Sequence, residues 1–245
     1  MGALYGEILL SQLLLVLWLL QAGPQGTGVL LSPGMSNEDL WLARRLFVET
    51  LGVAHADYRV PPRAPGSHDD LLRVADKHPN SRGAEVLGCG RAGAPDGRHV
   101  LEAARAGQLR LLWIFGHDLF ESGWPEAEVE EALARVEGIV FQGSNANRTS
   151  ARAHVVLPSA AYVEREGTWT NVTGRVQRFW RAVLPRAEAR ADWEIVAALA
   201  RALGQDWQPL RAANVFRDLV AASPAFAGLS YAALADHGAP LREGA

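Results

Sequence analysis

Short apolar segments alternate with amphipathic segments along most of this chain, and this alternation limits the possible fold more than any other feature. The apolar segments cover residues 27–31, 109–115, 139–141 and 154–157. Strands that are apolar on both faces are typical of parallel sheets that are covered by helices and joined by right-handed crossovers. The sequence therefore predicts an α/β fold, with a parallel sheet and helices on both faces.

Segments with helical periodicity connect these predicted strands. Residues 36–51 begin with a capping-box-like pair, Ser36 and Asp39, and carry apolar side chains at helical spacing. Residues 99–106 and 126–137 also favour helices, and each ends at a glycine. Each helix lies between two predicted strands, as a parallel sheet requires.

Composition divides the chain into three parts. Residues 1–25 predict an apolar N-terminal helix, residues 26–185 an α/β domain, and residues 186–245 a C-terminal helical appendix. Inside the α/β domain, residues 57–97 are rich in proline and glycine and predict an irregular excursion over the core. The helices expected in the C-terminal part cover residues 191–203, 212–222 and 230–236.

The N-terminal apolar run, Ile8–Leu20, is too short to cross a bilayer, which needs about 20 residues. Its length suits a signal peptide, but Glu7 occupies the place where such a peptide carries positive charge. A helix of the protein core is the better interpretation. We therefore expect no direct membrane span.

Composition excludes several classes of function. The only cysteine is Cys89, so the chain cannot supply the four or so thiolates of an iron–sulfur cluster or form a disulfide within itself. A reducing compartment is the easier interpretation. The seven histidines show no metal-binding spacing, and we assign no metal ligand and no catalytic residue. A net charge of −3 with mixed signs argues against nucleic-acid binding.

A polar segment after the last apolar run is the first candidate ligand site. Side chains that hydrogen-bond their own backbone lie between two glycines there, which favours an ordered loop, and strand-like residues follow. Such a loop can hold an anion or a polar ring system, and it can equally be a plain hairpin. The candidate binding residues are Gly167, Thr168, Thr170, Asn171, Gly174, Arg175 and Gln177.

The ends of the predicted strands form the second candidate site. Ligands of open parallel sheets bind beyond the carboxyl ends of the strands, where this sequence has Ser32, the run Gly116-His117-Asp118, and residues 142–145. A crevice and ordinary strand-to-helix turns both fit this pattern. His117 and Asp118 could handle a proton, but adjacent residues seldom face the same side. Gly116, His117 and Asp118 are kept as binding candidates only.

The same segments resemble a known family. The runs His154-Val-Val-Leu-Pro, Glu166-Gly-Thr-Trp-Thr-Asn and Gly174-Arg-Val-Gln resemble a signature of the molybdopterin oxidoreductase superfamily. Within it, the runs Leu31-Ser-Pro, Ser36-Asn-Glu-Asp, His78-Pro-Asn-Ser-Arg-Gly-Ala and Leu112-Trp-Ile-Phe-Gly look most like the large iron–sulfur subunit of respiratory NADH:quinone oxidoreductase, complex I. The resemblance covers roughly residues 26–204.

This resemblance implies a domain descended from enzymes that bind molybdopterin guanine dinucleotide. His154 stands where the family usually has Asp, His117-Asp118 where cofactor binders have Asn-Pro, and Thr173 where Glu is usual. These departures make bound molybdopterin unexpected and the candidate loop vestigial. The family's N-terminal cluster-binding region has no counterpart here, so the resemblance places any iron–sulfur clusters outside this chain and implies the C-terminal portion of such a subunit, or a truncated relative.

The function expected first is a non-catalytic scaffold in a complex I-like NADH dehydrogenase. It would support electron transfer from NADH to quinone, contact other subunits of the complex, and lie on the cytoplasmic side of the plasma membrane as a peripheral component. Two alternatives stay open. One is a partial dinucleotide-binding domain of a formate dehydrogenase-like oxidoreductase that shares the cofactor with another chain. The other is a free-standing α/β module that binds a small ligand.

Overall fold

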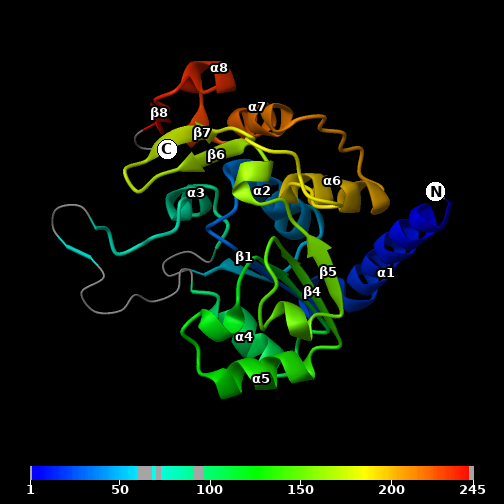
Figure 1. Ribbon diagram of the computed structural model, residues 1–245. Coiled ribbons are helices and arrows are strands. Elements are labelled where there is room, and N and C mark those ends of the chain that lie inside the picture. Colours follow the sequence, from blue (N-terminus) through cyan, green and yellow to red (C-terminus); the bar gives the residue numbers. More distant parts are fainter. Residues whose placement is uncertain (1, 60–67, 70–72, 91–95, 243–245) are drawn as a thin grey trace.

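The computed structural model describes residues 2–59, 68–69, 73–90 and 96–242 and contains two β-sheets with helices around them (Figure 1). The larger sheet has five strands and the smaller one three. The strands of the large sheet are β1 (Thr27–Leu31), β2 (His55–Tyr58), β3 (Leu111–Phe115), β4 (Gly138–Gly143) and β5 (Val155–Pro158).

The five strands are all parallel and follow the order β2-β1-β3-β4-β5. Every residue of β1 and β3 is buried, which agrees with apolar runs that have no polar face. The predicted α/β class, a parallel sheet covered by helices on both faces, is confirmed.

Alternate strand residues enter two separate apolar layers. Val29 and Trp113 point into the first layer, beside helices α1 (Gly2–Gly26), α2 (Asn37–Arg44), α6 (Asp192–Ala202) and α7 (Ala212–Ala222). Leu30 and Ile114 point into the second, beside α4 (Arg98–Arg105) and α5 (Glu126–Arg135). Figure 1 shows these two groups of helices on opposite sides of the sheet. The period-two alternation of a strand produces both layers.

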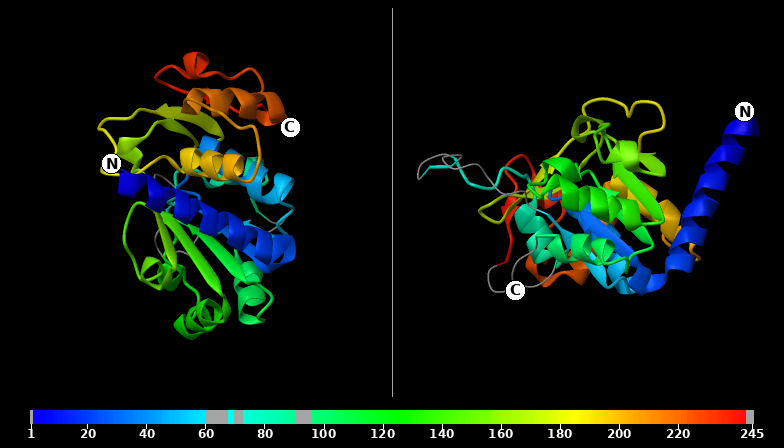
Figure 2. Two further views of the ribbon diagram at one scale, coloured as in Figure 1. Left: turned by 90° about the vertical axis from the view of Figure 1, so that its right-hand side faces the viewer. Right: turned by 90° about the horizontal axis from the view of Figure 1, so that it is seen from below.

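Helix α1 covers part of the first layer. Leu15 and Leu19 are buried, whereas Leu13, Leu17 and Leu20 on its other side are exposed. Figure 2 shows the N-terminal part of this helix extending beyond the body of the molecule. Within the described residues no helix is long and apolar enough to span a membrane.

The small sheet lies at the other end of the first layer. Strands β6 (Gly167–Thr170) and β7 (Arg175–Phe179) form an antiparallel hairpin, and β8 (Ala239–Pro240) pairs with β7. Helix α8 (Tyr231–Leu234) packs against β7. The plain-hairpin interpretation of the polar segment is therefore correct as a description of its backbone.

Three of the described elements depart from the sequence prediction. Helix α2 begins at the expected capping box, but the predicted helix continues after Arg44 as a π-helix, Arg45–Thr50. The segment predicted to be irregular contains the end of β2 and helix α3 (Ser81–Val86). β2 was missed because His-Ala-Asp-Tyr is half polar, as an edge strand can be when only one side is paired.

Candidate functional site

Three adjacent strands end at one edge of the large sheet and leave an open rim of small residues. We call this set the strand-end rim; it consists of Ser32, Gly116, Gly143, Ser144 and Asn145. Gly116, Ser144 and Asn145 are exposed and the other two are half-buried. A methyl group on Gly116, at φ +65°, would lie 3.7 Å from the Ser32 Cβ, and one on Gly143 would lie 2.7 Å from the Phe141 ring and 3.4 Å from the Gly116 Cα. Backbones of neighbouring strands therefore come close here with little side chain between them and solvent.

His117 follows this rim but points inward. Its side chain is buried, and its Nε2 donates to the Leu31 carbonyl at 2.8 Å in the neutral tautomer that this contact requires. Burial lowers the pKa of the imidazole to about 4, so it is neutral near pH 7. The residue ties the end of β3 to the end of β1 and has no access to a ligand on the rim.

Asp118 also has an internal role. One carboxylate oxygen accepts from the Phe120 N–H at 3.2 Å and from the Thr149 hydroxyl at 2.9 Å. The other accepts from the Arg148 N–H at 3.2 Å. The structure does not bring His117 and Asp118 together as a proton-handling pair. The His117 side chain reaches the end of the neighbouring strand β1, whereas the Asp118 side chain caps the turn that follows β3.

A buried charged cluster that the sequence does not predict lies under the same sheet edge. Asp192 accepts from Gln142 Nε2 at 2.8 Å and from the Ser159 hydroxyl at 2.5 Å. Arg165 bridges Asp192, at 3.0 Å, and Asp39. Burial raises the pKa of Asp192. These side chains come from four distant parts of the chain, so no local spacing marks them; they lock α2 and α6 against β4 and β5.

The hairpin hydroxyls point into the protein. Thr168 donates its backbone N–H to Glu38 at 2.8 Å and its hydroxyl to the same carboxylate at 3.0 Å. Asn37 Nδ2 donates to the hydroxyls of Thr168 and Thr170 at 3.0 and 3.1 Å. The Thr170 N–H donates to Asn80 Oδ1 at 2.7 Å. All five residues are buried, so these hydroxyls hold the hairpin on α2 and α3.

Glu38 is the most perturbed carboxyl group of this contact. It is fully buried, and desolvation raises its pKa to about 7 despite hydrogen bonds from Thr168 and from the Tyr231 hydroxyl at 2.8 Å. Burial, and next the contact with Glu38, raise the pKa of Tyr231. Glu38 thus connects α2, the hairpin and α8 through one side chain.

The remaining hairpin candidates also have structural roles. A methyl group on Gly167 would lie 2.9 Å from the Ser36 Cβ, so glycine is needed for the close approach of β6 to α2. Gly174 has φ +77° in the hairpin turn, a conformation that glycine adopts without strain.

Asn171, Arg175 and Gln177 lie on the outer side of the hairpin. Asn171 Oδ1 accepts from the Arg175 N–H at 2.9 Å and so caps the turn, while its amide nitrogen donates to Gln177 at 3.3 Å. The Arg175 guanidinium donates to the Gly238 carbonyl at 2.9 Å and fastens the C-terminal strand. Gln177 is exposed.

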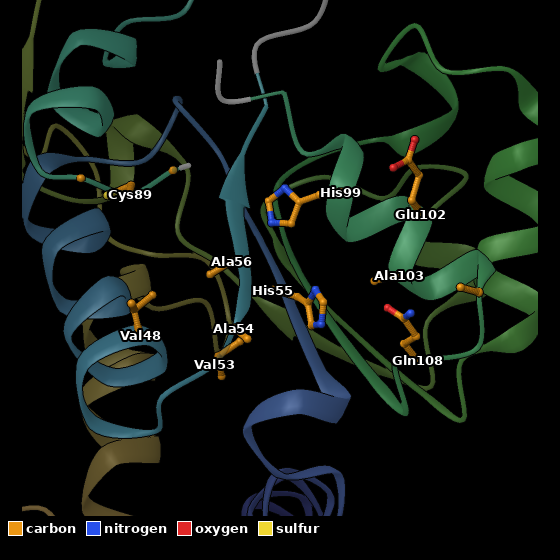
Figure 3. A pocket seen from close by; sticks show the side chains of 13 residues that line it. Val48, Val53, Ala54, His55, Ala56, Cys89, His99, Glu102, Ala103 and Gln108 are labelled. Carbon is orange, nitrogen blue, oxygen red and sulfur yellow. The ribbon is translucent and has the colours of Figure 1, made fainter. Parts of the chain in front are cut away.

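A cavity of about 670 Å³ lies elsewhere, along the free edge of β2 (Figure 3). Two histidines line it, His55 from the start of β2 and His99 from the first turn of α4. Burial, and the neighbouring His99, lower the pKa of His55. No local sequence pattern marks this pair, because the two histidines are far apart in the chain.

Comparison with known proteins gives the family. The model of the family described as molybdopterin oxidoreductase matches residues 36–202, which is more than half of the chain. The chain belongs to the molybdopterin oxidoreductase family. The match begins at the capping box of α2 and ends at the last residue of α6, so it contains the charged cluster, the hairpin and all of the strand-end rim except Ser32.

Two bacterial members of the family illustrate the relationship. A protein of Bacillus subtilis (strain 168), provisionally named a formate dehydrogenase, is 29% identical over 172 residues, which are 69% of this chain and 18% of the relative. One of Staphylococcus haemolyticus (strain JCSC1435) with the same provisional name is 27% identical over 177 residues, 70% of this chain and 17% of the relative. The chain therefore spans less than a fifth of the length of these relatives.

Among solved structures, acetylene hydratase from Pelobacter acetylenicus matches with a TM-score of 0.42 and 15% identity, over 54% of this chain and 19% of the hydratase. The superfamily resemblance expected from the hairpin motifs is confirmed at the level of the molybdopterin oxidoreductase family. The finer likeness to a complex I subunit has no counterpart in the names of these relatives.

The cofactor implied by the family can be compared with the side chains present. The hairpin hydroxyls and the Arg165 guanidinium are engaged inside the protein, so they do not fit as ligands of the diphosphate of a bound dinucleotide. The strand-end rim fits better, because Gly116, Ser144 and Asn145 are exposed, carry no long side chain and lie where ligands of open α/β sheets bind. The donor set fits one wall of a cofactor site and not a complete site.

Proposed function

We propose that this chain is a domain of a formate dehydrogenase-like molybdopterin oxidoreductase, and that its strand-end rim forms one wall of the site for molybdopterin guanine dinucleotide. Membership of the molybdopterin oxidoreductase family and the provisional names of its relatives support this proposal. One observation carries it: the exposed Gly116 and Ser144 and the half-buried Gly143 lie where two adjacent parallel strands end, and ligands of open α/β sheets bind at such ends.

In this proposal the rim binds through backbone groups and through the short side chains of Ser32, Ser144 and Asn145. When bound, the cofactor would supply the metal centre for two-electron oxidation of formate. The chain's own residues position the rim: His117 ties β3 to β1, and the Asp192 cluster fixes the end of β4 through Gln142. The diphosphate would need donors from another polypeptide or from a further segment, because the nearby Arg148 is paired with Glu126.

The test uses the complex that a tagged copy of this chain forms in its host. We expect molybdenum or tungsten in that complex and formate-dependent dye reduction. Asn145→Trp should reduce the bound metal and the activity at least tenfold, since a large exposed side chain would fill the rim. Ala232→Trp, at an exposed position on α8, is the matched control and should change neither. A complex without either metal would refute the cofactor role.

A second candidate function is the complex I-like scaffold. The hydrogen bonds of Thr168, Thr170 and Arg175 to other parts of the chain favour it, because an inherited loop kept only for its fold would make such contacts. This function would place the chain among other NADH dehydrogenase subunits, with the iron–sulfur clusters in them, on the inner face of the membrane. Co-purification of NADH:quinone oxidoreductase activity, with no molybdenum or tungsten, would favour it over the first proposal.

A further inference from the structure

The cavity along β2 has the two imidazole side chains of a potential metal site. It lies between the π-helix and α4, and Figure 3 shows the rings of His55 and His99 as neighbours in it, with Gln108 extending toward His55. The two ring centroids are 6.4 Å apart. The histidines come from different elements, so their proximity depends on the packing of α4 against β2.

A buried carboxylate orients one of these rings. His99 Nδ1 lies 3.3 Å from Asp57 Oδ2, and the Asp57 side chain has no exposed surface. The same carboxylate accepts from the Gly97 N–H at 3.1 Å, which fixes its position. A carboxylate that holds one ring nitrogen leaves the other to bind, and carboxylate–histidine–metal arrangements use this geometry.

The described lining of the cavity has no cationic side chain and offers ligand atoms for a metal ion. Of the described residues that line it, none is lysine or arginine, and Glu102 and Gln108 offer oxygen atoms. Cys89 also lines it, but its thiol is buried and burial raises its pKa to about 12, so it is not available as a thiolate. The available ligands are therefore imidazole nitrogen and oxygen.

We propose that this cavity binds a divalent transition metal ion, of the Zn²⁺, Ni²⁺ or Cu²⁺ class, through His55 and His99. Imidazole nitrogen is a well-suited ligand for ions of this class. At metal–nitrogen distances of about 2.0–2.1 Å, two imidazoles on one ion have centroids roughly 5.2–6.4 Å apart. The observed separation of 6.4 Å is at the upper end of this range, so binding draws the rings together by up to about 1 Å.

Two imidazoles do not complete the coordination of such an ion. In the described part of the chain, no three His, Cys, Asp or Glu side chains already surround a common point. Glu102 lies one helical turn after His99 on α4 and is paired with Arg98. It can reach the ion only by leaving Arg98, and water fills the other positions. This predicts moderate affinity that rests on both histidines.

The experiment is titration of the purified chain with Zn²⁺ and Cu²⁺ by calorimetry, with electron paramagnetic resonance of the Cu²⁺ form. We expect one ion per chain and hyperfine structure from two imidazole nitrogens. His55→Ala and His99→Gln should each weaken binding at least tenfold. In His99→Gln the side-chain amide can still donate a hydrogen bond to Asp57, so we expect the fold to be preserved. Circular dichroism of each variant checks this. His237→Ala, which removes an exposed histidine on another part of the surface, should bind like the unaltered chain.

The proposal fails if the unaltered chain binds neither ion, or if both cavity variants bind as tightly as it does. It also fails if His237→Ala loses as much affinity as they do. None of these results bears on the strand-end rim, because the cavity and the rim share no residue.

Discussion

Single buried titratable residues make the stability of this protein depend on pH in two opposite ways. Glu38 is fully buried with its pKa raised to about 7, and His117 is fully buried with its pKa lowered to about 4. In both cases removal from water disfavours the charged form, so each folded-state group prefers to be neutral. Neither group needs a ligand to account for its shift.

For Glu38 the folded-state pKa exceeds the unfolded value of 4.5, so its stabilising contribution is complete below pH 4.5 and is lost as pH rises through 7. The full loss is on the order of 3 kcal/mol. We expect Glu38→Gln to remove most of the pH dependence in that window. Urea unfolding at a series of pH values measures it, and an unchanged slope in the variant would contradict the assignment.

For His117 the order is reversed, since the folded pKa of about 4 lies below the ordinary 6.5. Its contribution is complete above pH 6.5 and is lost as pH falls toward 4. His117→Gln keeps a donor for the Leu31 carbonyl and should flatten the acid side of the stability profile. If the variant and the unaltered chain lose stability in parallel below pH 6.5, another group is responsible.

At the scale of elements, the start of α2 is the structural centre of the family region. Its Asn37 and Glu38 hold the hairpin, and Asp39 both closes the capping box with Ser36 and pairs with Arg165. Three consecutive buried polar residues at a helix start are unusual because burial of polar groups is costly unless each finds a partner. Here each partner comes from a distant element.

Asn37→Ala should therefore destabilise the protein by about 2–3 kcal/mol, because it removes hydrogen bonds to two buried hydroxyls and leaves both without that partner. Asn171→Ala is the matched control. Asn171 caps an exposed turn, so its replacement should cost about 1 kcal/mol or less. Denaturant midpoints compare the two, and equal losses would mean that α2 does not hold the hairpin.

At the scale of the whole molecule, Trp113 connects the first apolar layer to the charged cluster around Asp192. Its ring is fully buried beside Phe47 at 5.2 Å between centroids, and its Nε1 donates to Gln142 at 3.2 Å. Gln142 in turn donates to Asp192 in the charged cluster. The core of the sheet and the base of the strand-end rim are thus continuous.

Trp113→Phe keeps an aromatic ring but removes the donor and some volume. We expect a loss of roughly 1–3 kcal/mol in the free energy of unfolding, from a partly filled cavity and an unsatisfied Gln142 oxygen. Because the layer and the cluster are continuous, unfolding should remain one transition by both fluorescence and circular dichroism. Two separated transitions would show that the first apolar layer and the charged cluster unfold independently of each other.

The amino-acid sequence by itself determines the class of fold. The apolar runs at residues 27–31 and 109–115 are buried at every position of β1 and β3, because a parallel strand has no polar face. The capping box at Ser36 and the helix at residues 212–222 are equally local signals, and both are present. The hairpin motifs carry the family, which the comparison confirms.

Only the tertiary structure decides what the candidate residues do. Thr168, Thr170 and His117 have the right chemistry for a ligand, but the directions of their side chains depend on partners such as Glu38 and Leu31. The edge strand β2, the Asp192 cluster and the His55–His99 pair escape any local pattern for the same reason. Secondary structure follows from periodicity over a few residues, whereas a site is assembled by contacts between residues far apart in the chain.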